Sequence, residues 1–150
     1  MIEIIESSIE SKDAEKLISE LNQSLIEITG DDGTSNFNSD DVKEIGTVFL
    51  IAYFNGIPYG CGALRKLSDD VAEIKRIYAK TNCVGIGRAI IEKLEEKAVE
   101  FGYARILLET RKQNKHAIKF YNRCGYVHCE TYGRYRTNDD AYCFEKNLNM

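Results

Sequence analysis

The sequence predicts a mixed α+β domain, and two features carry this prediction. Residues 71–125 follow the pattern strand, glycine loop, helix, strand and helix. Residues 47–66 hold two β-branched and aromatic segments joined by Asn55-Gly56, a dipeptide typical of two-residue hairpin turns. The 150 residues are 43% apolar and 29% charged, which suits one domain with a hydrophobic core. We therefore expect a single domain over residues 1–150 with the order β-α-(α)-β-β-β-α-β-α-β-β.

The N-terminal part predicts a strand, a long helix and a polar loop. Residues 2–6 form a short apolar strand segment. Ser11 is placed to cap a helix whose apolar residues recur every three or four positions until Gly30. Residues 30–41 show no periodicity and predict a loop, and a short helical turn is expected over residues 40–45.

Three strands are expected next. Residues 47–54 and 57–66 predict the two arms of the hairpin, and residues 71–79 predict the strand that follows it. Gly60 and Gly62 interrupt the second arm, which indicates a bulge or a close approach of the backbone.

The C-terminal half predicts two helices and three strands. Residues 86–101 carry apolar positions at helical spacing, and residues 104–110 alternate like a strand. Asn114 can cap a further helix that stops at Gly125. The last two strands are expected over residues 126–131 and 141–148, on either side of a tyrosine-rich loop.

Two motifs in this half resemble the acyl-CoA signature of the GNAT superfamily of N-acetyltransferases. The first is Gly85-Ile86-Gly87, a glycine loop that opens a helix and so presents free amides and a positive dipole to an anion. The second is Asn114-x-x-Ala117-x-x-x-Tyr121-x-x-x-Gly125-Tyr126, which follows the next strand. The resemblance implies a strongly twisted mixed sheet that splays between the strands at 71–79 and 104–110, with acyl-CoA in the splay.

By this resemblance, acetyl-CoA is the cosubstrate. The phosphates of CoA are expected at the glycine loop, where Asn82 stands in place of the Arg or Gln common in the family. Lys80 could add positive charge there. The amides that would bind the phosphates belong to five consecutive residues, Val84, Gly85, Ile86, Gly87 and Arg88.

The pantetheine arm of CoA is expected to lie along the strand at 71–79 like an added strand. The resemblance places it against the backbone of Ile77, Tyr78 and Ala79. Asn114 is a further contact in the family, and from the sequence it is equally an ordinary helix cap. The two roles are compatible because they use different groups of the residue.

The resemblance also implies three roles in the transfer itself. The attack of an amine on a thioester creates an oxyanion, which the amide of Ile77 stabilises. Tyr121 donates a proton to the departing thiolate, whereas an isolated tyrosine in this pattern would be expected in the core. Glu73 removes a proton from the amine, and the alternative is a strand glutamate that points outward or is held in an ion pair.

Charge and cysteine content restrict the partners. The net charge is −4, but residues 1–60 hold twelve acids and three bases, and residues 61–150 hold twelve acids and seventeen bases. A polyanionic cofactor suits the second part, and a cationic acceptor such as a polyamine suits the first. The acidity disfavours nucleic acid as a partner, and the longest apolar run, residues 48–54, is too short to span a membrane.

Five cysteines, an odd number with irregular spacing, predict reduced thiols and a cytoplasmic protein. Cys124, His128 and Cys129 match no zinc-binding pattern, so no metal site is expected.

The sequence therefore predicts an N-acetyltransferase that moves an acetyl group directly from acetyl-CoA to a primary amine in a ternary complex. The acceptor would be a small molecule or a protein amine, and the resemblance implies a homodimer through the last strands. Two other hypotheses are open. One is a non-catalytic acyl-CoA-binding sensor or interaction module. The other is a nucleotide-binding α/β domain, which is disfavoured because, apart from Glu109, no acidic residue follows the glycine loop at the distance and strand end that a ribose contact requires.

Overall fold

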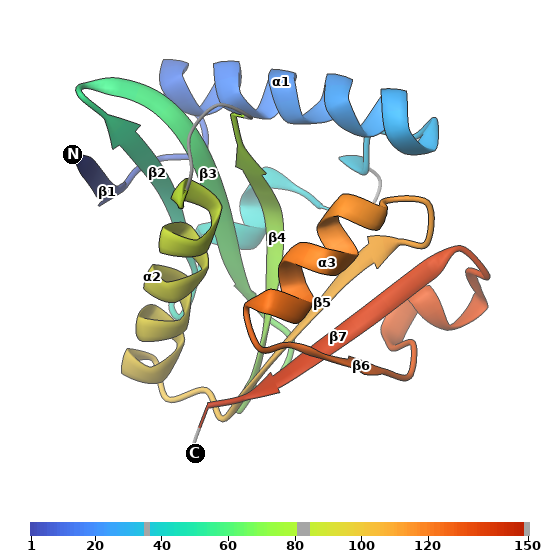
Figure 1. Cartoon of the computed structure of the whole chain (residues 1–150). Coiled ribbons are helices and arrows are strands. Elements are labelled where there is room, and N and C mark those ends of the chain that lie inside the picture. The colour runs from blue at the N-terminus through green and yellow to red at the C-terminus, as the bar shows by residue number, and fades with distance from the viewer. Residues whose placement is uncertain (35–36, 81–84, 149–150) are drawn as a thin grey trace.

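The computed structural model describes residues 1–34, 37–80 and 85–148, which form one mixed sheet with helices on both faces (Figure 1). Seven strands of this described part lie in the order β1-β2-β3-β4-β5-β7-β6. β4 and β5 are parallel, and the other neighbouring strands are antiparallel. The strands are β1 Ile2–Glu6, β2 Val48–Phe54, β3 Ile57–Lys66, β4 Val71–Ala79, β5 Arg105–Arg111, β6 Val127–Cys129 and β7 Ala141–Asn147.

The helices occupy the predicted positions between these strands. They are α1 Lys12–Thr29, α2 Ile86–Glu100 and α3 Lys115–Arg123, with 3-10 helices η2 Ser39–Val42 and η3 Gly133–Thr137. The predicted α+β class and element order are therefore confirmed.

Local chemistry sets the ends of α1 as the sequence predicts. The Ser11 hydroxyl accepts a hydrogen bond from the Ala14 amide at 3.2 Å. Asp13 and Glu15 lie in the first turn, where the helix dipole favours negative charge. Gly30 ends the helix with φ +82°, a conformation that glycine adopts without strain.

The sheet separates two hydrophobic clusters. α1 packs on one face, where Leu17 lies in a cluster with Ile51 of β2. α2 and α3 cover the other face, where Leu94 and Tyr121 share a cluster with Leu50. Leu50 and Ile51 enter different clusters because successive residues of a strand point to opposite faces. The core therefore has two layers, with the sheet between them.

β3 and β4 contain the bulge that the glycines of β3 indicate. A register shift between Cys61 and Ala63 leaves Gly62 opposite two residues of β4, Arg76 and Ile77. Arg76 takes the left-handed conformation with φ +59°, which is uncommon outside glycine. A Cβ on Gly62 would lie 2.6 Å from the Ile77 side chain, so only glycine fits there without a shift.

β4 and β5 pair over a short stretch and then separate. Their register covers Val71–Glu73 against Arg105–Leu107, at the start of both strands. Within the described residues, β4 has no strand beside it on this side from Ile74 to Ala79. Figure 1 shows the two strands diverging, with α3 in front of the gap. The predicted splay of the sheet is therefore present.

The C-terminal region differs from expectation in detail. The strand expected over residues 126–131 is shorter, Val127–Cys129, and the tyrosine-rich loop contains η3. η3 lies on the α1 face, because Tyr135 is buried against Cys143 of β7. The turn expected at 40–45 begins one residue earlier, because Asn38 and Asp41 form a capping box around η2. No helix in the described part of the chain has the length and apolarity needed to cross a membrane.

Candidate active site

A cleft of about 840 Å³ opens where β4 and β5 diverge. Its walls come from α1, β4, the start of α2, the end of β5 and α3. Leu25 of α1 lines it on one face of the sheet, and Tyr121 of α3 lines it on the other. The cleft therefore passes through the sheet, so that a ligand on the α2–α3 face could meet a ligand on the α1 face.

The wall formed by β4 contains the three predicted pantetheine contacts. Ile77, Tyr78 and Ala79 all line the cleft on the unpaired side of β4. The bulge takes Ile77 out of the regular register with β3, so its amide is a candidate donor to a ligand. The Tyr78 hydroxyl instead donates to Glu20 of α1 at 3.0 Å, and burial is the main cause that raises the Tyr78 pKa to about 12.

The start of α2 forms the predicted phosphate end of the cleft. Gly85 has φ +90°, and a Cβ added at this position would have no described atom within 4 Å. Among the described residues, which leave out 81–84, no side chain caps this helix end and no acidic residue lies in its first turn. The first amides and the positive end of the dipole are therefore available to an anion.

The other residues predicted to bind the phosphates differ in which of their groups could reach a ligand. Gly87 and Arg88 line the cleft, and Arg88 is exposed. The Ile86 side chain is fully buried in the core, so only its backbone could meet a ligand. Asn82 and Val84 lie outside the described residues.

α3 contributes the residues of the second motif. Asn114 lines the cleft, and its side-chain oxygen accepts a hydrogen bond from the Ala117 amide at 3.2 Å, so its capping role is confirmed. Tyr121 is buried, with its ring 5.8 Å from that of Phe144. In the part of the chain that the structure describes, the Tyr121 hydroxyl has no hydrogen-bond partner. Burial raises the Tyr121 pKa, which keeps this hydroxyl protonated.

Glu73, the predicted base, does not line this cleft. It is fully buried and directly opposite Arg65 in the register of β3 and β4. Arg65 donates a hydrogen bond from Nε to Oε1 of Glu73 at 2.7 Å, and its Nη2 lies 2.6 Å from the same oxygen. The Tyr132 hydroxyl donates a hydrogen bond to Oε2 of Glu73. This arrangement favours the alternative of a structural ion pair over a free base.

Glu109 of β5 is the carboxylate that does line the cleft. Its side chain is 6% exposed, and burial raises the pKa of its carboxyl to about 7 even though Arg111 opposes the shift. Oε2 lies 3.2 Å from Nη1 of Arg111, yet neither atom has a hydrogen-bond partner among the described residues. The sequence held one signal for Glu109: alternation places it on the opposite face of β5 from Leu108, which is in the core.

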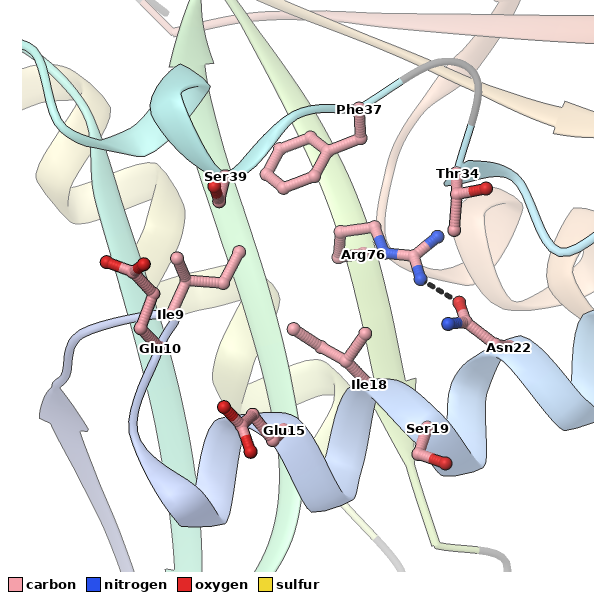
Figure 2. A pocket seen from close by; sticks show the side chains of 10 residues that line it. All are labelled: Ile9, Glu10, Glu15, Ile18, Ser19, Asn22, Thr34, Phe37, Ser39 and Arg76. Atoms are coloured by element: carbon pink, nitrogen blue, oxygen red, sulfur yellow. Dashed lines mark hydrogen bonds between the residues drawn. The ribbon is translucent and has the colours of Figure 1, made fainter.

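The α1 side of the cleft is bounded by Arg76, the residue at the bulge. Its guanidinium donates to the Asn22 side chain on α1 and to the Asp32 carbonyl at 3.1 Å. Figure 2 shows Arg76 between Asn22 and Thr34, with Phe37 above a second hollow of about 400 Å³. Arg76 therefore separates this hollow from the main cleft, because it lines both.

The described residues contain no group of three or more His, Cys, Asp or Glu side chains placed to hold a metal ion.

Comparison with known proteins agrees with this architecture. Residues 14–126 match the sequence model of the acetyltransferase (GNAT) family. Over 103 residues the chain is 30% identical to the IAA acetyltransferase of Azospirillum brasilense, which covers 67% of each protein. The chain belongs to the GNAT acetyltransferase family, and it is an acyltransferase.

Solved structures show the same fold at low sequence identity. A Klebsiella pneumoniae protein assigned to the acyl-CoA N-acyltransferases has a TM-score of 0.80 at 24% identity and covers 99% of this chain and 98% of its own. The PaiA N-acetyltransferase of Thermoplasma acidophilum, solved in complex with coenzyme A, has a TM-score of 0.73 at 20% identity. That match covers 98% of this chain and 99% of PaiA.

Proposed function

We propose that this protein transfers an acetyl group from acetyl-CoA to a primary amine while both substrates are bound in the cleft between β4 and β5. One observation carries the proposal: Ile77, Tyr121 and Glu109 come from three different elements and line one cleft. The acceptor enters from the α1 face, and acetyl-CoA lies on the side of α2 and α3.

The described residues fit the two halves of acetyl-CoA. The free edge of β4 suits an extended pantetheine arm, because main-chain groups at an open strand edge bind extended ligands. The start of α2 at Gly85, which no described side chain caps, suits the pyrophosphate, and Arg88 adds positive charge beside it. Bound acetyl-CoA supplies an activated acyl group as a thioester.

Two residues act on the charges that develop during transfer. As the amine nitrogen forms its bond to the acyl carbon, negative charge grows on the carbonyl oxygen, and the Ile77 amide donates to that oxygen. The C–S bond then breaks, and the Tyr121 hydroxyl gives its proton to the sulfur. Tyr121 lines the cleft and its hydroxyl has no competing partner in the described structure, which supports this role.

Glu109 is the group we propose as the base that takes the proton from the amine. It lines the cleft, and its pKa of about 7 matches a base that works near neutral pH. Glu73 is engaged by Arg65 and Tyr132, so we propose a structural role for it. The proton held by Glu109 later passes to solvent, and solvent reprotonates Tyr121.

The remaining expectations stay proposals. We propose that residues 1–150 act as one domain and that the protein works in the cytoplasm with its cysteines reduced, since Cys61, Cys124, Cys129 and Cys143 are free thiols. A homodimer is proposed from the family resemblance alone.

The proposal is tested with purified protein, acetyl-CoA and a panel of primary amines, with N-acetylated product detected by mass spectrometry. Once an acceptor is found, initial rates are measured with both substrates varied. Direct transfer predicts intersecting double-reciprocal lines, whereas parallel lines would indicate a covalent acetyl-enzyme and contradict it. Binding of acetyl-CoA without any product from any amine would instead support the sensor hypothesis.

A further inference from the structure

The acceptor side of the cleft carries more positive than negative side chains. Lys75, Arg76 and Arg111 are among the basic residues that line it on the α1 face. The acidic residues that line the same region are Glu109 and Asp31. An amine acceptor alone gives no reason for this excess of buried positive charge beside its binding site.

The partners of these basic groups are weak for buried cations. Lys75 is 9% exposed as a residue, and its ammonium donates to the Tyr135 hydroxyl at 2.6 Å, a neutral partner. Arg76 also donates to neutral oxygens, those of the Asn22 side chain and the Asp32 backbone carbonyl, and the Asp32 carboxylate acts on it without a hydrogen bond. Nearby Glu73 is committed to Arg65, so it does not balance Lys75 directly. Buried positive charge that lacks an acidic partner favours an anionic ligand.

Arg111 gives the strongest support for an anionic ligand. Its partner in the described structure is Glu109, at 3.2 Å, and Nη1 is buried without a hydrogen bond. The Glu109 and Arg111 side chains lie on the same face of the sheet as Cys143 and Ala141, the β7 residues opposite them. A group that accepts from Arg111 and another that donates to Glu109 would together satisfy both residues.

The short distance between Glu109 and Arg111 limits how far apart these two groups lie on the ligand. If the amine meets Glu109, an anion bound by Arg111 must lie only a few bonds from the nitrogen. A carboxylate matches the planar donor fork of a guanidinium.

We propose that the acceptor is a free amino acid, whose α-carboxylate is bound by Arg111 with Lys75 beside it while Glu109 takes a proton from its amine. This inference rests on the proposed function, because it assumes that Glu109 faces the attacking amine. It replaces the cationic acceptor that the acidic N-terminal part of the sequence indicates. Of the acidic residues in that part, Asp31 lines this cleft, whereas Glu10 and Glu15 line the second hollow.

The test compares matched acceptors that share a side chain. The full-length protein and acetyl-CoA are incubated with amino acids covering small, aliphatic, aromatic and polar side chains. Each is paired with its carboxamide and its decarboxylated amine, and polyamines are included. For the best side chain we expect kcat/KM of the amino acid to exceed that of the amide by about 30-fold, the usual worth of a charge-assisted contact.

Variants then assign the effect to Arg111. Arg111→Gln should remove most of the preference for the amino acid over its amide, mainly through a higher KM, and Arg111→Lys should restore part of it. Rates are compared at about pH 8.5, where Glu109 is largely ionised. Arg105→Gln is the matched control: Arg105 lies on the same strand and also pairs with a glutamate, Glu145, but it does not line the cleft.

The outcomes separate the two proposals. Acetylation of amides, decarboxylated amines or polyamines at least as well as amino acids would overturn the carboxylate site and leave the acetyltransferase proposal standing. An amino-acid preference that survives in Arg111→Gln would also overturn it. No stabilisation by acetyl-CoA and no product from any amine would overturn the proposed function, and this inference with it.

Discussion

The substitution Glu109→Gln tests the chemistry of the cleft most sharply. The carboxyl has a pKa of about 7, so it is mostly protonated at pH 6 and mostly ionised at pH 8. If the ionised form takes the proton of the amine, kcat of the wild-type protein rises about tenfold between these pH values and levels off above them. The neutral amide of glutamine keeps the shape of the side chain and cannot take a proton, so we expect kcat to fall about 100-fold and this pH dependence to disappear.

The assay is the appearance of N-acetylated product at saturating concentrations of both substrates, from pH 5.5 to pH 9. Glu145→Gln is the control, because Glu145 also pairs with an arginine but lies outside the cleft. It should keep the wild-type profile. A wild-type rate that is flat across pH 6 to pH 8, or a Glu109→Gln profile that still rises tenfold, would refute the assignment of Glu109 as the base.

Three further predictions follow from the same contacts. Glu73→Gln should leave the pH profile unchanged and lower the free energy of unfolding by about 2 kcal/mol in urea titrations, because it removes one of the two carboxylates that pair with Arg65 and leaves Asp41 alone; a lost pH dependence would return the base to Glu73. Tyr121→Phe should lower kcat about 100-fold while calorimetry finds unchanged acetyl-CoA binding; full activity would exclude it as the acid. Gly60→Ala should cost about 2 kcal/mol of stability and weaken acetyl-CoA binding, because the new Cβ would lie 2.7 Å from the Tyr78 carbonyl oxygen; wild-type behaviour in both measurements would contradict this.

The order of elements follows closely from local sequence patterns. Asn55-Gly56 forms the turn of the β2–β3 hairpin with φ values of 52° and 81°, as a turn of this type requires. Gly60 and Gly62 mark the place where β3 lies close to β4 and α2. These features depend on a few neighbouring residues, so a single sequence contains them.

The choice between carboxylates depends on pairing between distant strands, which local patterns do not encode. Glu73 is held in an ion pair because the register of β3 and β4 places Arg65 opposite it. Glu109 reaches the cleft because β5 leaves β4 after three paired residues. The family resemblance points to the strand of Glu73, and the tertiary structure favours the neighbouring strand.

The burial of the tyrosine-rich segment also depends on contacts that local sequence patterns do not encode. Its polar composition indicates a loop, yet Tyr135 is buried and its hydroxyl accepts a hydrogen bond from Lys75 of β4. This contact joins residues 60 positions apart in the chain. It forms because η3 covers the α1 face of β7, an arrangement that only the folded sheet creates.

The crystal structure of the protein with acetyl-CoA bound is the most direct test of the central claim, that acyl transfer takes place between β4 and β5. We expect pantetheine along the free edge of β4, with the thioester carbonyl oxygen about 2.7–3.1 Å from the Ile77 amide nitrogen. The sulfur should lie within hydrogen-bonding reach of the Tyr121 hydroxyl, and Glu109 should face the acetyl group from the α1 side. A thioester bound elsewhere, or one whose path to Glu109 is blocked by the sheet, would contradict the account.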